Sequence, residues 1–87
     1  MLAQATHTLS VSELNQQASQ CLEQQFRVVH VVGEISNLAC PSSGHWYFSL
    51  KDQHAQVRCA FFKTRHRNTI PMPKNGDEVL VLARVSL

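Results

Sequence analysis

The residues of this chain best suited to chemistry are aromatic and cationic side chains that alternate in its central part. Residues 44–52 read GHWYFSLKD, and a period of two places Tyr47 and Lys51 on one face of a strand. The following segment, QVRCAFF, places Arg58 and Phe62 on one face in the same way. Aromatic rings and cations that share a sheet face suit stacked bases and their phosphates. The pattern predicts a surface that binds single-stranded nucleic acid.

Ten residues are candidates for that surface. Tyr47 and Phe62 are the predicted stacking platforms, although core packing is the usual fate of Phe. The predicted phosphate contacts are the cations Lys51, Arg58, Lys63, Arg65, Arg67 and Arg84. In the loop before the aromatic segment, Ser43 and His45 could hydrogen-bond a nucleic-acid strand or merely stabilise the turn. Because a single surface cation is usually just solvated, the prediction depends on the cluster.

The charge is unevenly distributed along the 87 residues. Residues 1–50 contain one basic and three acidic residues, whereas residues 51–87 contain seven basic and three acidic residues. Five of these seven cations lie between Lys51 and Arg67. A local cationic patch can hold a polyanion, but it can equally be a solubilising surface. Charge alone does not choose between the two.

An amphipathic helix is predicted close to the N-terminus. Its apolar residues recur at helical spacing at Leu14, Ala18, Cys21, Leu22 and Phe26. Ser10 and Glu13 have the spacing of a capping box, and Ser12 is a rival N-cap. Residues 1–8 precede this signal and are expected to be a disordered tail.

From Arg27 onward the period changes to two and predicts strands over about residues 27–36, 45–51, 56–62 and 78–87. Gly33 interrupts the first strand, which predicts a bend or a bulge. In the second strand Trp46, Phe48 and Leu50 are expected to face the core, and Ser49 to face outward with Tyr47. Residues 63–68 are basic without a helical period and are expected to form an irregular connector.

A helix followed by four strands fits a mainly β fold with an N-terminal α-helix. The expected architecture for residues 9–87 is the oligonucleotide-binding (OB) fold, whose five strands close a partly open barrel. Only four strands are predicted here, so the last strand is expected to follow outside this sequence or to come from another copy. In the second case the open edge would recruit a partner strand and form a homo-oligomer.

Other classes of protein find little support in the sequence. The three cysteines, Cys21, Cys40 and Cys59, are an odd number without a framework spacing, which favours a reduced, cytoplasmic protein. Their spacing to His45 and His66 is not that of a zinc site, so we expect no metal and no cofactor. No nucleophile–base pair or Gly-rich phosphate loop indicates catalysis. The longest apolar runs are too short to cross a membrane.

Four motifs occur in order along the chain. They are VSELN from Val11, GEISN from Gly33, SGHWYFSLKD from Ser43 and AQVRC from Ala55. Together they resemble the amino-terminal domain of the large subunit of bacterial exodeoxyribonuclease VII. The resemblance runs in one register from about Leu9 to the end of the sequence. One departure is His30, where the family often has an aromatic residue.

The resemblance implies an OB domain that binds single-stranded DNA. In that family the chain continues into a further strand and a long catalytic region, and the full enzyme degrades single strands to oligonucleotides with several copies of a small subunit. No residue of the present sequence inherits a catalytic role. The alternative is an interaction domain that docks onto another subunit or copy and touches nucleic acid only incidentally. An RNA-binding barrel like those of aminoacyl-tRNA synthetases shares the fold but not the motifs.

Overall fold

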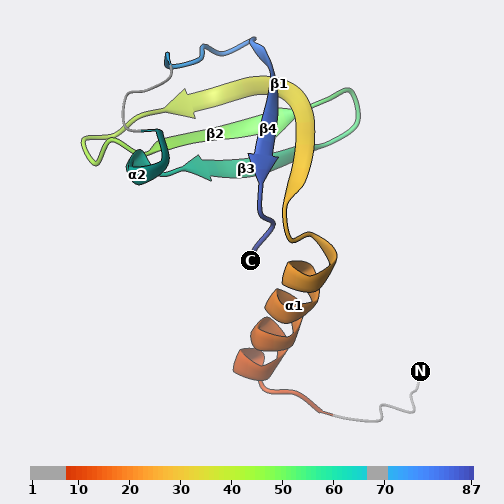
Figure 1. Ribbon diagram of the computed structural model, residues 1–87. Coiled ribbons are helices and arrows are strands. Elements are labelled where there is room, and N and C mark those ends of the chain that lie inside the picture. The colour runs from red at the N-terminus through yellow and green to blue at the C-terminus, as the bar shows by residue number, and fades with distance from the viewer. Residues whose placement is uncertain (1–7, 67–70) are drawn as a thin grey trace. The chain divides into compact units, whose positions relative to one another are not determined.

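The computed structural model describes residues 8–66 and 71–87, and this described part contains two helices and four strands (Figure 1). In chain order the elements are α1 (Val11–Gln25), β1 (Val29–Ala39), β2 (Trp46–Lys51), β3 (Gln56–Phe61), α2 (Lys63–His66) and β4 (Glu78–Ala83). The strands form one sheet in the order β3-β2-β1-β4. The expected N-terminal helix and mainly β composition are confirmed. The chain forms two units, residues 31–81 and residues 1–30 with 82–87.

Helix α1 begins at the predicted capping box. The Glu13 N–H donates to Ser10 Oγ at 3.1 Å, and the Ser10 N–H donates to Glu13 Oε1 at 2.8 Å. Ser10 is therefore the N-cap and the rival Ser12 is not. No residue of α1 is buried, and Cys21 on its expected apolar face is exposed. Apart from Thr8, the expected disordered tail lies outside the described residues.

The register of the sheet defines two faces. Strands β2 and β3 are antiparallel and pair Trp46 with Phe61, Phe48 with Cys59, Ser49 with Arg58 and Leu50 with Val57. Strand β1 is antiparallel to β2 and pairs Glu34 with Lys51, Ile35 with Leu50 and Ser36 with Ser49. Because directly opposed residues point to the same side, one face carries the apolar set and the other carries Glu34, Ser36, Tyr47, Lys51 and Arg58.

The core lies on the apolar face. Ile35, Phe48 and Leu50 form the buried cluster, and Trp46 is also buried, with its ring 5.4 Å from Phe61 in an edge-to-face contact. The expected inward positions of Trp46, Phe48 and Leu50 are confirmed. On the same face, burial raises the pKa of the Cys59 thiol although Arg58 is next to it in the chain. Cys59 is therefore a small, half-buried packing residue.

Ser49 departs from the expected exposure. Its register places it on the face of Tyr47 and Arg58, as predicted, yet it is only 2% exposed. Its short side chain lies between its cross-strand partners Ser36 and Arg58 on the two flanking strands. A small residue on an inner strand, with a neighbour on each side, is thus buried, which alternation alone does not reveal.

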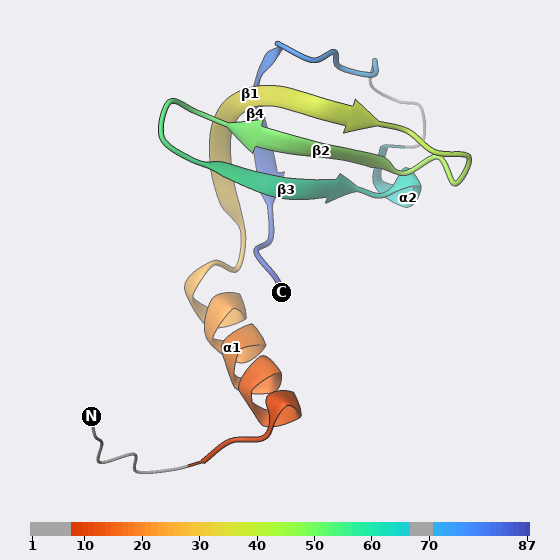
Figure 2. The same ribbon diagram turned by 180° about the vertical axis from the view of Figure 1, so that it is seen from behind.

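Strand β1 is longer than expected, and its bulge lies elsewhere. It continues to Ala39, with a shift of register between Ser36 and Ala39 where Asn37 has a φ of 53°. Asn tolerates this left-handed conformation better than most residues. Both views show β1 strongly curved (Figures 1 and 2). At Gly33, where a bend or a bulge was expected, the missing side chain allows close packing, because a Cβ there would lie 2.8 Å from Leu50 Cγ.

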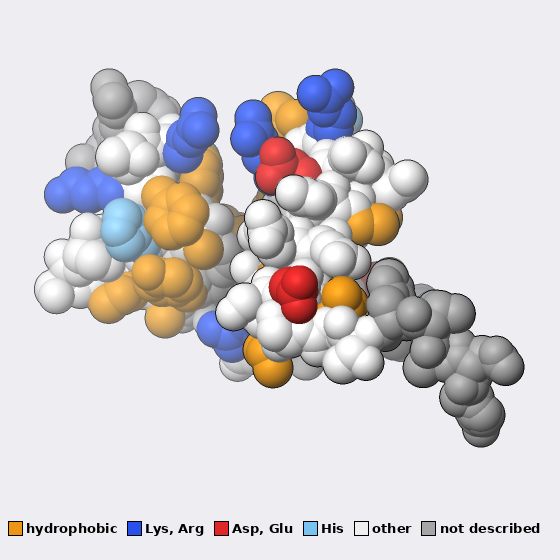
Figure 3. All heavy atoms as spheres, turned by 90° about the horizontal axis from the view of Figure 1, so that it is seen from below, with side chains coloured by type: hydrophobic (Ala, Val, Ile, Leu, Met, Phe, Trp, Pro, Cys, Tyr) orange, Lys and Arg blue, Asp and Glu red, His pale blue; other side chains and the backbone are white. Residues whose placement is uncertain are grey.

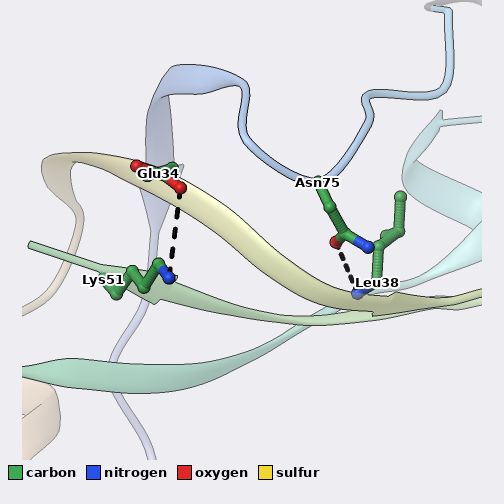
Figure 4. A network of polar contacts seen from close by, with 4 residues as sticks. All are labelled: Glu34, Leu38, Lys51 and Asn75. Atoms are coloured by element: carbon green, nitrogen blue, oxygen red, sulfur yellow. Dashed lines mark hydrogen bonds and ion pairs between the residues drawn. The ribbon is translucent and has the colours of Figure 1, made fainter.

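The turn before β4 is held to β1 on both sides of this bulge. The Leu38 N–H donates to Asn75 Oδ1 at 2.9 Å (Figure 4), and the Ile35 N–H donates to the Asp77 carbonyl at 2.9 Å. The Gly76 N–H in turn donates to the Ile35 carbonyl at 2.8 Å. Strand β4 then ends at Ala83, short of the expected residue 87. Apolar alternation continues beyond the last strand residue, so it overestimates the strand.

The β2–β3 hairpin turn is organised by Asp52. The N–H groups of His54 and Ala55 donate to Asp52 Oδ1 at 2.8 and 2.9 Å, and the Asp52 N–H donates to the Ala55 carbonyl at 3.0 Å. The bond from His54, and then that from Ala55, holds the pKa of the Asp52 carboxyl below its ordinary value of 3.8. The ionised carboxylate is therefore the form that the folded turn prefers.

Replacing Asp52 by alanine is expected to lower the melting temperature at neutral pH by a few degrees. A carboxyl whose pKa is lowered by folding stabilises the protein above its ordinary value of 3.8, and this contribution is lost as the pH falls through the lowered pKa. The difference in melting temperature between the two proteins should shrink below about pH 4. Thermal unfolding followed by circular dichroism at several pH values measures it.

The matched control is Asp52→Asn, which keeps the acceptor oxygen but cannot ionise. It should retain much of the stability at neutral pH and show no such change of stability with acid. A difference between Asp52→Ala and the unchanged protein that stays constant into strong acid would contradict the assigned role of the carboxylate.

Candidate nucleic-acid interface

The predicted surface lies on the sheet face opposite the core. Cross-strand pairing places Lys51, Tyr47 and Arg58 on this face, with Ser49 paired directly to Arg58. Lys51 and Arg58 are exposed and Tyr47 is half-buried. A strand pair that offers one ring and two cations outward has the composition of a single-strand binding surface.

An aromatic cluster borders this face where β3 gives way to α2. The His45 ring lies 5.3 Å from the Phe62 ring and 6.4 Å from the Tyr47 ring, both in edge-to-face geometry. Phe62 is the residue between β3 and α2 and is 50% exposed. In Figure 3 a histidine side chain lies against hydrophobic side chains, with Lys or Arg side chains close by on the same face. The two predicted stacking residues are thus joined through His45.

The loop before β2 is fastened to the start of α2. His45 Nδ1 accepts a hydrogen bond of 2.9 Å from the Lys63 N–H, and Ser43 Oγ accepts one of 3.3 Å from the His45 N–H. Gly44 has a φ of 84°, and a Cβ there would lie 2.8 Å from Lys63 Cδ, so the stem of Lys63 lies against the loop. Ser43 therefore stabilises the turn, which was one of the two roles considered for it.

The expected irregular connector contains a helical turn. Residues Lys63–His66 form α2, in which the Arg65 N–H donates to the Phe62 carbonyl at 2.8 Å. The prediction of no helix was wrong here because four residues are too few to display a helical period. The turn carries Lys63 and Arg65, both exposed, directly after Phe62.

The cations differ in their surroundings. Lys51 Nζ lies 4.0 Å from Glu34 Oε2, and both side chains are about half exposed (Figure 4). Within residues 8–66 and 71–87 no ion pair joins Arg58, Lys63 or Arg65 to a carboxylate. The cations left without a carboxylate partner therefore lie on β3 and α2, at Arg58, Lys63 and Arg65.

The remaining predicted cations are Arg84 and Arg67. Arg84 is exposed beyond the end of β4 and belongs to the unit of residues 1–30 and 82–87. Arg67 falls outside the described residues. Two features were not expected from the sequence: the contribution of Glu34, which only the β1–β2 register places opposite Lys51, and the link from His45 to Lys63.

In the described part of the chain, no three His, Cys, Asp or Glu side chains gather closely enough to hold a metal ion. None of the helices found in the same residues has the length and apolar character needed to cross a membrane.

Comparison with known proteins identifies the family. The protein-family model described as "OB-fold nucleic acid binding domain" matches residues 9–87 of this chain. The chain is 56% identical over 78 residues to the exodeoxyribonuclease 7 large subunit of Hahella chejuensis, covering 90% of this chain and 18% of that protein. It is 53% identical over 78 residues to the subunit of the same name from Pectobacterium carotovorum, covering 90% of this chain and 17% of that protein. It is 52% identical over 80 residues to the subunit from Legionella pneumophila, covering 91% of this chain and 18% of that protein.

The sequence resemblance is thereby confirmed, and the chain spans less than a fifth of the length of these relatives. An N-terminal helix and a mainly β, four-stranded sheet that does not close into a barrel agree with the matched family. The chain therefore belongs to the family of OB-fold nucleic acid binding domains.

Proposed function

We propose that this chain is the single-stranded DNA-binding domain of an exodeoxyribonuclease VII large subunit. The observation that carries the proposal is that Phe62, Arg58 and Lys63 are exposed along β3 and the segment that follows it, beside Tyr47 of β2. The similarity to the named large subunits supports DNA, rather than RNA, as the ligand.

In this proposal the DNA strand lies across the outer face of β2 and β3. Phe62 and Tyr47 stack on bases, each contributing about 1–3 kcal/mol. Arg58, Lys63 and Arg65 contact phosphates, and Arg67 and Arg84 are further phosphate contacts predicted from the sequence. Single strands are preferred because stacking needs unpaired bases with open faces.

The whole protein, in this proposal, degrades single-stranded DNA to oligonucleotides in the cytoplasm together with a small subunit. The chemistry belongs to the remainder of the large subunit, and none of the present residues is catalytic. The role of this domain is to hold a single strand, without a metal or cofactor.

Fluorescence anisotropy with labelled oligo-dT tests the proposal. We expect a dissociation constant on the order of micromolar to millimolar and much weaker binding of duplex DNA. Three or four neutralised phosphates predict a log–log salt slope of about −2 to −3. Salt-independent binding, or equal binding by a Tyr47→Ala, Arg58→Ala double variant, would exclude the proposed surface.

Replacing Glu34 by glutamine is expected to tighten oligo-dT binding about two- to fivefold at low salt, because a partly exposed ion pair is worth at most about 1 kcal/mol. The change frees Lys51 from its partner at 4.0 Å and removes a negative charge from the DNA-facing side of the sheet. Anisotropy titrations at two salt concentrations measure the gain, which should fade as salt rises.

Glu78→Gln is the matched control, since it removes an equal charge from an exposed carboxylate of β4. It should change the affinity less than Glu34→Gln. Equal gains in both variants would show that net charge alone, and not the release of Lys51, governs the effect.

A second candidate function is self-association. Strands β3 and β4 are the outer strands of the sheet, and Val57 is 52% exposed although its register places it on the core face of β3. An apolar side chain beside an unpaired strand edge favours a partner strand. Light scattering over a wide range of protein concentration separates the two candidates, because a monomer at every concentration would exclude this one.

A further inference from the structure

We infer that His45 is a positioning residue for the proposed DNA-binding surface: its neutral imidazole clamps the β1–β2 loop to the start of α2 and so fixes Phe62 and Lys63. The inference rests on the proposed function for its effect on binding. The clamp itself stands on contacts within the protein.

The hydrogen bond to the His45 ring requires a particular protonation of that ring. The Lys63 N–H donates to His45 Nδ1 at 2.9 Å. A ring nitrogen can accept this bond only when it carries no proton, so the imidazole is neutral and its proton is on Nε2. The contact thus requires both one charge state and one tautomer.

The backbone N–H of Lys63 needs an acceptor from outside α2. The first N–H groups of a helix have no partner within the helix, and Lys63 is the first residue of α2. The hydrogen bond of this turn, from the Arg65 N–H to the Phe62 carbonyl, does not involve the Lys63 N–H. A side chain 18 positions earlier in the sequence supplies the cap.

The clamp holds the segment that follows β3. A helix of one turn is unstable by itself. The edge-to-face contacts from His45 to Phe62 and Tyr47, together with the approach of Lys63 Cδ to Gly44, hold the segment after β3 against the loop. The stacking ring of Phe62 and the cation of Lys63 are therefore set in place by His45.

Two amide variants test the clamp. His45→Asn places its carbonyl oxygen near the position of Nδ1, whereas His45→Gln places it near Nε2, and both lose the ring. We expect oligo-dT affinity within about threefold of the unchanged chain for His45→Asn, and a fall of about fivefold or more for His45→Gln, the difference reflecting one hydrogen bond.

Nuclear magnetic resonance separates this inference from the proposed function. Long-range proton–nitrogen spectra of the free protein should show the Nε2–H tautomer of His45, and the Lys63 amide should shift in His45→Gln but little in His45→Asn. These readouts stand even if the unchanged chain binds no DNA, which would overturn the proposed function alone. An Nδ1–H tautomer, or equal losses in the two amide variants, would overturn the clamp.

Discussion

A double variant with alanine at Tyr47 and Phe62 is expected to bind single-stranded DNA at least about 30-fold more weakly than the unchanged chain. Each ring is expected to stack on one base, and each stack contributes about 1–3 kcal/mol, so two losses amount to about 2–6 kcal/mol. The Phe62 ring is half exposed and is open to a ligand. Anisotropy titration with labelled oligo-dT measures the change.

The fold should survive this double substitution, since neither ring belongs to the buried cluster. Circular dichroism checks that it does. The control is Val57→Ala, which removes an equally exposed apolar side chain from the opposite face of β3. A double variant that is folded and binds as tightly as the Val57→Ala control would rule out stacking as the basis of affinity.

Replacing Phe48 by alanine is expected to cost about 3–5 kcal/mol of unfolding free energy. Phe48 is 5% exposed and packs in the cluster with Ile35 and Leu50, so its removal leaves a cavity in the core of the sheet. Domains of this size are commonly stable by only about 5–15 kcal/mol, so the loss is a large part of the total. Urea unfolding measures it, with Trp46 as the fluorescent reporter because it is the sole Trp and is buried.

Phe62→Ala makes the same chemical change at an exposed position and is the matched control. It should lower the unfolding free energy by less than about 1 kcal/mol, as is usual for surface substitutions, while weakening DNA binding. Phe48→Ala should lower the unfolding free energy much more than Phe62→Ala does. Where it remains folded, it should weaken DNA binding less. Equal unfolding midpoints for the two variants would contradict the assignment of the two sheet faces.

Much of the fold follows from local patterns in the sequence. Period-two alternation placed Trp46, Phe48 and Leu50 in the core, and the capping-box spacing placed the start of α1 to within two residues, at Ser10 or its rival Ser12. Such features depend on residues within a few positions of one another. The sequence records them directly.

The features that sequence analysis missed depend on distant contacts. The bulge at Asn37 is held by Asn75, which lies 37 positions from Leu38, and the His45–Lys63 bond spans 18 positions. The Glu34–Lys51 ion pair follows only from the strand register. For the candidate site, alternation could therefore predict that Tyr47 and Arg58 share one face of the sheet. It could not predict the contacts that place Phe62 and Lys63 at the border of that face.

Chemical-shift mapping of the labelled chain with oligo-dT tests whether DNA binds the outer face of β2 and β3. Amide signals of Tyr47, Arg58, Phe62 and Lys63 are expected to move with increasing DNA, while those of the core-face residues Ile35 and Leu50 move little. Shifts confined to other elements, with these four signals unchanged at saturation, would contradict it.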